Sequence, residues 1–316
     1  MTTAVANRQT GRAAEKVKSG TSWRKNVTPG KIVALTFLGF LLIVTLFPFF
    51  WMIRTGFTPA SELVADSGRF FPSNPTWVNF RRVVGLTTFE ESVAAGGTGS
   101  SLNFLRYTWH TIIYAGGIAV IQTLASAGAA YAFARLRFKG RDGLFSVFLA
   151  GLLIPGILTL LPNFALIRNS GLMNTFLGMM APSLLMSPFA IFFLRQFFLS
   201  LPREVEEAAA IDGVGPFGRF FKIALPMSRG PIATMMMITL VGMWNNFMWP
   251  LVSGNSDNTR VLTVALQTFQ AQSPNHAPDW TGLMAASTVV VIPVFIMLVF
   301  LGKQLVQSLN FSGGKM

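Results

Sequence analysis

The chain has 316 residues, of which 52% are hydrophobic and only 12% are charged. Because about a quarter of the residues in soluble domains are charged, this composition excludes an ordinary soluble domain and indicates a helical membrane protein. The net charge of +13 then reflects membrane topology and contact with anionic lipid rather than binding of nucleic acid. The sequence has no cysteine, so it has no disulfide framework and no thiol chemistry.

Residues 1–31 form a polar, basic segment that we expect to be a disordered cytoplasmic tail, because it holds too few apolar residues to bury a core. The apolar run that follows is longer than the core of a signal peptide, which spans about 7–15 residues. No small-residue cleavage pattern comes after it. We therefore expect this run to be the first membrane span rather than a cleaved signal.

Long apolar runs without Asp or Glu alternate with short charged segments along the rest of the chain. A helix needs about 20 apolar residues to cross the hydrocarbon core, and prolines are tolerated there because neighbouring groups re-satisfy the freed carbonyls. The expected spans are residues 32–53, 107–134, 143–167, 169–194, 230–252 and 281–302. The sequence therefore predicts an all-α integral membrane protein with six transmembrane helices, a transmembrane domain over residues 32–307 and a short cytoplasmic tail over residues 308–316.

Basic residues indicate how these helices are oriented. Most of the 25 Lys and Arg residues lie in the N-terminal tail, in the segments after the second and fourth expected spans, and at the C-terminus. Positive charge marks the cytoplasmic side of a membrane. Both termini are therefore expected in the cytoplasm, together with the segment between the fourth and fifth spans.

That segment, residues 201–231, is the most informative part of the chain. Pro202 suits the first turn of a helix, where its missing N–H costs nothing. Acidic residues follow in the turns where they favour the helix dipole, and an alanine run adds strong helix formers. Gly213 stands where a left-handed residue ends a helix. The helix-forming residues are Glu204, Glu206, Glu207, Ala208, Ala209 and Ala210.

A second short helix is expected to begin at Pro216, with Phe217, Phe220 and Phe221 on its apolar side. The two helices would lie flat below the membrane, and a solvated linker is the other interpretation. The glycines from Gly213 onwards also fit the dinucleotide-binding pattern GxGxxG. We reject that reading because the pattern has meaning only between a strand and a helix.

The order and spacing of these residues resemble the cytoplasmic coupling loop of ABC importer permeases. The resemblance rests on Glu207-Ala208-Ala209, Asp212-Gly213, Phe220 and Leu225-Pro226. The chain is similar to the smaller permease subunit of binding-protein-dependent carbohydrate importers of the maltose-transporter type. The resemblance extends from the first span to about Gln307, and the C-terminus keeps only part of the Gly-rich tail that is frequent in the family.

The resemblance implies partners, a location and a mechanism. It implies a second homologous permease subunit, two copies of an ABC ATPase subunit, an extracytoplasmic solute-binding protein and a place in the bacterial inner membrane. ATP and Mg²⁺ would bind to the ATPase subunits, and this chain would carry no cofactor. Closure of the ATPases would move residues 202–212 as a lever that opens the cavity outward. The implied ATPase-coupling residues are Glu204, Glu207, Ala208, Ala209, Asp212, Gly213, Phe217, Phe220 and Pro226.

The sequence lacks the motifs of a transporter that supplies its own energy. No GxxxxGK[ST] pattern occurs, so no P-loop hydrolysis of ATP is expected from this chain. No Asp or Glu lies in an expected span, although ion-coupled carriers keep such groups there. His110 and His276 lack metal-ligand spacing, so no metal site and no catalytic residue are expected. A transport subunit driven from outside is favoured, and a stand-alone channel or secondary carrier for a polar solute is the alternative.

A Trp- and Asn-rich cluster within the fifth span is the candidate for the solute path. Aromatic faces and amides suit sugars, so the cluster could line a cavity. Anchoring of the Trp rings at the outer membrane boundary is the second interpretation. Two further polar residues in spans are weaker candidates, because such residues also join helices. The candidates are Trp244, Asn245, Asn246, Trp249, Asn163 and Gln122.

Two external segments are long. Residues 253–280 are rich in Asn and Gln, and in the resembled family the loop at this place reaches toward the solute-binding protein. A solvated connection is the other interpretation. Residues 96–101 form a Gly/Ser cluster that we expect to be a flexible insertion.

Overall fold

The computed structural model describes residues 29–94, 102–271 and 279–310, and the regular elements in these ranges are all helices. The chain divides into two units, residues 1–48 and 49–316. Helix α1, Pro29–Gly56, runs across the boundary between them. Its side chains are apolar and exposed on all sides up to its last turns, as expected for a helix whose environment is lipid or another apolar surface. The tail before Pro29 and the Gly/Ser cluster lie outside the described residues.

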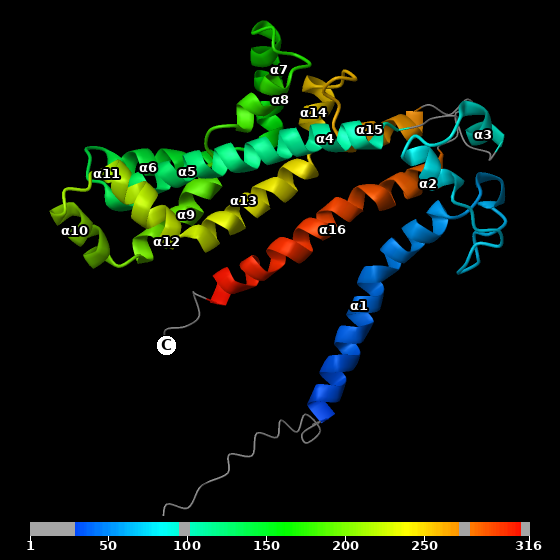
Figure 1. The fold of residues 1–316 in the computed structure, drawn as a ribbon, viewed down its shortest axis with the longest axis horizontal. Helices are drawn as coiled ribbons and strands as arrows, with labels where there is room; N and C mark the ends of the chain where they lie inside the picture. The colour runs from blue at the N-terminus through cyan, green and yellow to red at the C-terminus, as the bar shows by residue number, and fades with distance from the viewer. Residues whose placement is uncertain (1–28, 95–101, 272–278, 311–316) are drawn as a thin grey trace, which may run out of the picture. The chain divides into compact units, whose positions relative to one another are not determined.

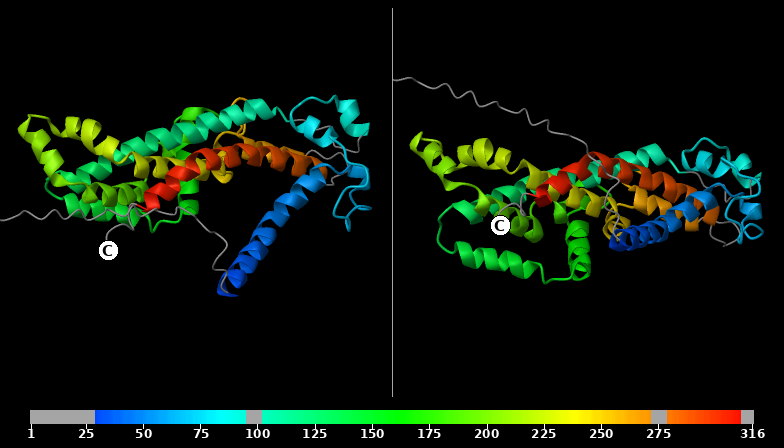
Figure 2. Two further views of the ribbon diagram at one scale, coloured as in Figure 1. Left: turned by 60° about the horizontal axis from the view of Figure 1, so that its bottom comes forward. Right: turned by 90° about the horizontal axis from the view of Figure 1, so that it is seen from below.

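The second unit is a bundle built around one long helix. Helix α4, Phe104–Thr111, continues through a π-helical turn, Ile112–Gly116, into α5, Gly117–Arg135. Its bounds confirm the expected second span to within a few residues. Helices α9, Pro188–Ser200, and α13, Arg229–Trp244, pack against α5. Helix α16, Trp280–Asn310, lies beside α13 (Figures 1 and 2).

Two expected spans are not straight helices. Helix α6, Arg141–Gly151, meets Gly156–Asn169, which contains η3 (Gly156–Thr159) and α7 (Leu160–Asn169), at 92°. Likewise Phe176–Ser183, with α8 (Phe176–Met180) and η4 (Ala181–Ser183), is bent by 54° from α9. The spans expected over 143–167 and 169–194 therefore correspond to bent helix pairs, and the sequence did not indicate the bends. Pro155 disfavours helix in the residue before it and lacks an N–H, which explains the first break.

The remaining boundaries also differ from the prediction. The expected fifth span, 230–252, is interrupted at residues 245–247, after which α14, Met248–Ser253, begins. The external segment 253–280 contains a helix, α15, Leu262–Ala271. Helix α16 begins at Trp280 as expected and continues into the predicted C-terminal tail. By length and composition, two described helices could cross a membrane, or up to five if each bent pair forms one span.

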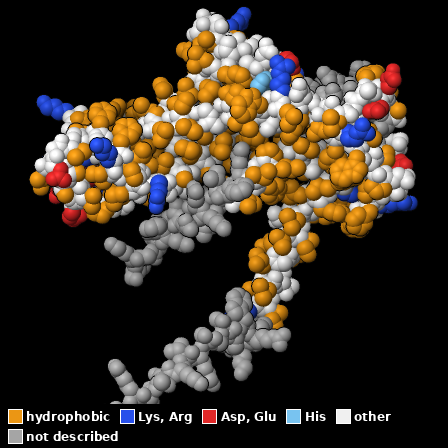
Figure 3. Space-filling view, viewed as in Figure 1, with side chains coloured by type: hydrophobic (Ala, Val, Ile, Leu, Met, Phe, Trp, Pro, Cys, Tyr) orange, Lys and Arg blue, Asp and Glu red, His pale blue; other side chains and the backbone are white. Residues whose placement is uncertain are grey.

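The short helices of the second unit lie at opposite ends of the bundle. Helices α10, Arg203–Ile211, and α11, Pro216–Arg219, lie at one end, and α2, Val78–Val83, and α3, Phe89–Ala94, lie at the other (Figures 1 and 2). Figure 3 shows acidic side chains at these two ends, and between them a mainly hydrophobic surface with one charged cluster beside a histidine on its upper edge. This distribution fits an apolar band between two aqueous faces.

A buried ion pair fixes the end that carries α2. The guanidinium of Arg82 on α2 binds the carboxylate of Asp279, and both side chains are almost fully buried, at 0% and 2% exposed. Asp279 also accepts the backbone N–H of Gly282 at 2.9 Å, which caps the first turn of α16. Asn79 donates to the carbonyls of Gly56 and Thr58 at 3.0 and 2.9 Å. The start of α16 is thus joined to α2 and to the end of α1.

Candidate functional site

The segment between α9 and α13 forms the helix, glycine bend and second helix that the sequence predicts. Pro202 stands at the N-cap position, and Arg203–Ile211 is helical. The side chains of Glu204 and Glu207 are exposed, whereas Glu206 between them is buried. The acidic residues of α10 therefore face two different environments.

Glu206 anchors α10 to the end of the long helix. Its Oε1 lies 3.3 Å from Nε of Arg135, and the Arg135 and Glu206 side chains are 7% and 9% exposed. The hydroxyl of Tyr131 donates to Oε2 of Glu206 at 3.2 Å, and Arg135 also donates to the carbonyl of Leu201. Glu206 is not among the coupling residues predicted from the sequence, because a buried glutamate in an acidic helix gives no local signal without its partner.

Gly213 ends α10 in the conformation expected of it. Its φ is +79°, in the left-handed region that favours glycine. Its N–H donates to the carbonyl of Ala210 at 3.1 Å, and the N–H of Val214 donates to that of Ala209 at 2.9 Å. This pair of bonds is the Schellman arrangement, which satisfies carbonyls that a helix end leaves free. A methyl group at Gly213 would meet nothing within 4 Å, so only the backbone conformation requires glycine.

The outer face of α10 is both acidic and apolar. Glu204, Glu207 and Asp212 are exposed and form no ion pair within the described residues. Ile211 is 88% exposed beside them, and Ala208 is exposed while Ala209 is half-buried. This face therefore presents both charged and apolar groups to its surroundings.

The second helix divides its aromatic residues between core and surface. Phe220 is buried, with ring centroids 5.3 Å from Tyr131 and 6.3 Å from Phe198. Phe217, however, is 81% exposed, and Phe221 is also exposed. The expected common apolar side is therefore split. Pro226 lies exposed in α12, Leu225–Met227, which follows the π-helical segment η5, Phe220–Ala224.

The candidates for the solute path are placed at and near the break between α13 and α14. Trp244 and Trp249 are buried, and Nε1 of Trp249 donates to the carbonyl of Met179 at 2.7 Å. Asn246 donates to the hydroxyl of Tyr114 at 3.1 Å, and its carbonyl accepts from Thr263 at 2.8 Å. These contacts place most of the cluster inside the bundle.

The other polar candidates lie apart from one another. Asn245 is exposed at the break, with its amide donating to the carbonyl of Val241 at 2.9 Å. Gln122 is buried on α5 and donates to the carbonyl of Ser183, which joins α5 to the segment before α9. Asn163 is half-buried on α7.

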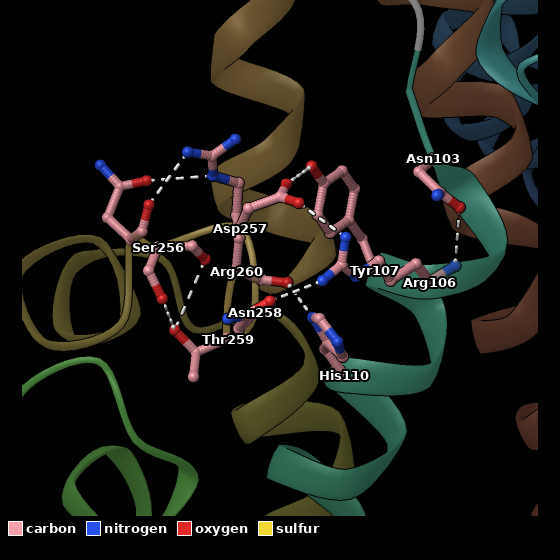
Figure 4. A network of polar contacts seen from close by, with 10 residues as sticks. Asn103, Arg106, Tyr107, His110, Ser256, Asp257, Asn258, Thr259 and Arg260 are labelled. Atoms are coloured by element: carbon pink, nitrogen blue, oxygen red, sulfur yellow. Dashed lines mark hydrogen bonds and ion pairs between the residues drawn. The ribbon is translucent and has the colours of Figure 1, made fainter.

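A polar network joins α4 to the loop between α14 and α15 (Figure 4). Arg106 pairs with Asp257 at 2.6 Å and donates to Asn258 at 2.7 Å. The hydroxyl of Tyr107 donates to Asp257 at 2.6 Å, and Nδ1 of His110 lies 3.0 Å from the carbonyl of Arg260. The bond from Tyr107 holds the pKa of Asp257 below its usual value, and Arg106 acts in the same direction against the effect of desolvation.

A multi-pass helical bundle with an exposed acidic helix between two membrane segments defines the chain as a membrane permease. Residues 21–310 match the family of binding-protein-dependent transport system inner membrane components, and the chain belongs to this family. It is thus a multi-pass protein of the inner membrane and the permease component of an ABC transporter.

Relatives and a solved structure agree with this assignment. The chain is 32% identical to an arabinooligosaccharides transport system permease protein of Halalkalibacterium halodurans, over 87% of this chain and 93% of the relative. It is 30% identical to a diacetylchitobiose uptake system permease protein of Streptomyces coelicolor, over 85% and 83%. A chain in the crystal structure of a bacterial ABC transporter for import of the polysaccharide alginate has the same fold. The TM-score is 0.70 at 20% identity, over 86% of this chain and 95% of that one.

Proposed function

We propose that the chain is a transmembrane permease subunit of an ATP-driven importer for a carbohydrate. The relatives that match it over most of their length carry names of oligosaccharide transport systems. The coupling role rests on one observation about α10. Its Glu204 and Glu207 carboxylates are exposed, while the buried Arg135–Glu206 pair joins the helix to α5. An ATPase that contacts this helix would act on α5 through that pair.

The assembly that we propose follows from this surface. Two ATPase subunits, which bind ATP and Mg²⁺, receive α10 of this chain and the matching helix of a second, homologous permease. A solute-binding protein delivers the carbohydrate at the opposite end. Six spans with both termini in the cytoplasm put α10 on the ATPase side, in agreement with the positions of the basic residues. The coupling helix moves as a rigid body because the buried pair joins it to a long helix.

The solute path that we propose runs along the break between α13 and α14. Asn245 is exposed there, and irregular backbone at membrane depth is tolerated where it is buried in protein or lines a cavity. The buried Trp244 and Trp249 and the half-buried Asn246 would shape the path from within the bundle. Gln122 and Asn163 would contribute farther along it.

The alternative, a stand-alone channel or secondary carrier, lacks a specific supporting observation. Ion-coupled carriers keep acidic groups within their spans, and the expected spans hold none. Energy from a separate ATPase accounts both for the absence of acidic residues in the expected spans and for the exposed acidic helix.

A purification from native membranes tests the proposal. The tagged chain is extracted in mild detergent, its partners are identified, and ATPase activity is measured with and without the solute-binding protein and an oligosaccharide. We expect a second permease, an ATPase pair and activity that the loaded binding protein increases. Glu207→Arg should reduce recovery of the ATPase, whereas Asp142→Arg, at an exposed acid outside α10, should not. A chain that is recovered alone and moves solute without ATP would overturn the proposal.

A further inference from the structure

An apolar groove lies between the second half of α5 and the segment that begins α11. Its volume is about 320 Å³. Leu124, Gly128 and Tyr131 of α5 line one side, and Phe217 and Phe221 line the other. The proposed contact between an ATPase and α10 does not use the α5 side of the groove, although Phe217 and Phe220 on the other side are among the coupling residues that the resemblance implies.

Small residues on α5 create the depth of this groove. Ala125, Gly128 and Ala132 lie on one face of the helix, because residues three and four positions apart are neighbours on a helix surface. A methyl group at Gly128 would meet nothing within 4 Å, so the space above the helix is open. Phe217 and Phe221, at 81% and 60% exposed, form the wall. All the residues that line the groove are apolar apart from the Tyr131 hydroxyl, so hydrocarbon matches the groove in polarity.

Basic residues adjoin the residues that line the groove. Lys222 directly follows Phe221 in the sequence and Arg137 directly follows Leu136, and both basic side chains are exposed. Nε of Arg219, between the two groove-lining phenylalanines, is buried without a hydrogen-bond partner among the described residues. No acidic residue lines the groove. A ligand that combines hydrocarbon with negative charge matches both parts of this site.

We propose that the groove binds one anionic phospholipid of the inner leaflet. An acyl chain lies over Gly128 between Tyr131 and the phenylalanines, and the phosphate is held by Lys222, Arg137 and Arg219. Basic pockets between spanning helices on the cytoplasmic side are a recognised form of anionic lipid site. The assignment rests on the orientation given with the proposed function, which puts this end of the bundle at the cytoplasmic surface.

The groove adjoins the residues that join α10 to α5, so a bound lipid would affect the coupling helix. Tyr131 lines the groove with its ring and donates its hydroxyl to Glu206 of α10. Phe220, which also lines the groove, packs against the same ring at 5.3 Å. A bound acyl chain therefore supports the junction through which α10 is joined to α5.

Photolabelling tests the site directly. The full chain, in its native complex, is placed in nanodiscs that contain a photoactivatable phosphatidylglycerol with its reactive group on an acyl chain. We expect labelled peptides from residues 124–136 and 216–221, with stronger competition from phosphatidylglycerol than from phosphatidylcholine. Gly128→Leu fills the groove and should abolish this labelling. Gly143→Leu is the matched control, because Gly143 is also a helical glycine with open space around it.

Charge variants test the headgroup. Lys222→Gln and Arg137→Gln should each lower the preference for phosphatidylglycerol over phosphatidylcholine about fivefold, as expected for one basic residue at a membrane surface. Equal competition by both lipids, unchanged by these variants, would refute an anionic lipid site.

A photoreactive phenylalanine at position 217 tests the other possible occupant. Crosslinking to the second permease instead of lipid would show that a protein covers the groove and would overturn the proposal. Labelling needs neither ATP nor solute, so it is independent of transport. A chain that binds lipid here but is not part of an importer would refute the proposed function alone.

Discussion

Oε1 of Glu206 lies 3.3 Å from Nε of Arg135 in a site that is almost closed to water. The two residues belong to different parts of the fold, since Arg135 ends the long helix and Glu206 lies on the short helix between α9 and α13. Separating such a pair would leave two charges in a site that water scarcely reaches, which is costly. The pair is therefore the joint that holds α10 to the end of α5.

Glu206→Gln should destabilise this joint while the exposed Glu207→Gln should not. The first change keeps the shape of the side chain but leaves the Arg135 charge without its carboxylate, at a cost of about 3 kcal/mol. We expect a lower melting temperature in detergent and a loss of ATP-driven uptake. Glu207→Gln should keep the wild-type melting temperature and weaken only the association with the ATPase. Equal melting temperatures for the Glu206→Gln variant and the wild type would contradict the role of the pair.

Gly213 provides a test of backbone conformation without any change in packing. At φ of +79° a valine costs about 1–2 kcal/mol, although the space around Gly213 is open. Gly213→Val should therefore loosen the end of α10, increase its cleavage by protease and reduce uptake, while membrane insertion stays normal. Gly213→Asn should be milder, because Asn tolerates the left-handed region.

The matched control for this test is Gly215. Its φ is −64° and its surroundings are equally open, so Gly215→Val should change protease sensitivity little. If both valine variants behaved alike, the effect at Gly213 could not come from its conformation.

The starts and ends of the helices in residues 201–231 were predictable because they depend on residues close by in the sequence. Pro216 begins a helix as expected, Pro202 stands at the N-cap one residue before the helix it was expected to begin, and Gly213 ends that helix, since caps and turns are decided by a few adjacent residues. The burial of Glu206 was not predictable in this way, because its partner Arg135 is distant in sequence. The split between Phe220 and Phe217 likewise depends on the position of α5.

The broken helices were missed for a related reason. Hydropathy around Pro155 is high enough for a span, so composition alone could not separate one straight helix from two helices at 92°. A proline permits both outcomes, and packing of the surrounding helices decides between them. The network around Asp257 joins residues about 150 positions apart, and no pattern along the chain indicates such a contact.

The buried pair between Arg82 and Asp279 should show strong coupling in a double-mutant cycle. Arg82→Met or Asp279→Leu alone removes one charge and leaves the other in a site that is closed to water, which costs about 3–5 kcal/mol. The double variant should recover part of this loss, because it leaves no unpaired charge, but the Gly282 N–H and Asn79 lose the partners that Asp279 and Arg82 provide. Thermal unfolding of the four proteins measures the coupling, and additive losses would contradict it.

Trp244 and Trp249 form a second matched comparison. Trp249→Phe removes the hydrogen bond from Nε1 to the Met179 carbonyl, which should cost about 1 kcal/mol. Nε1 of Trp244 is buried without a hydrogen-bond partner in the described part of the chain, so Trp244→Phe loses ring area but no bond. We expect a clearly lower melting temperature for Trp249→Phe than for Trp244→Phe, and the reverse order would contradict these contacts.

The contact between α4 and the loop before α15 should depend on pH only in acid. The folded-state pKa of Asp257 lies below the usual value of about 4, so its stabilising effect is complete above that value. It is lost as pH falls from about 4 through the lowered pKa. The difference in melting temperature between wild type and Asp257→Asn should therefore be constant from about pH 6 to 8 and shrink below about pH 4. Tyr107→Phe removes the main cause of the shift, so in that background the difference should be smaller at neutral pH and its loss should be complete at a higher pH. A difference that varies across neutral pH would show that another group controls this contact.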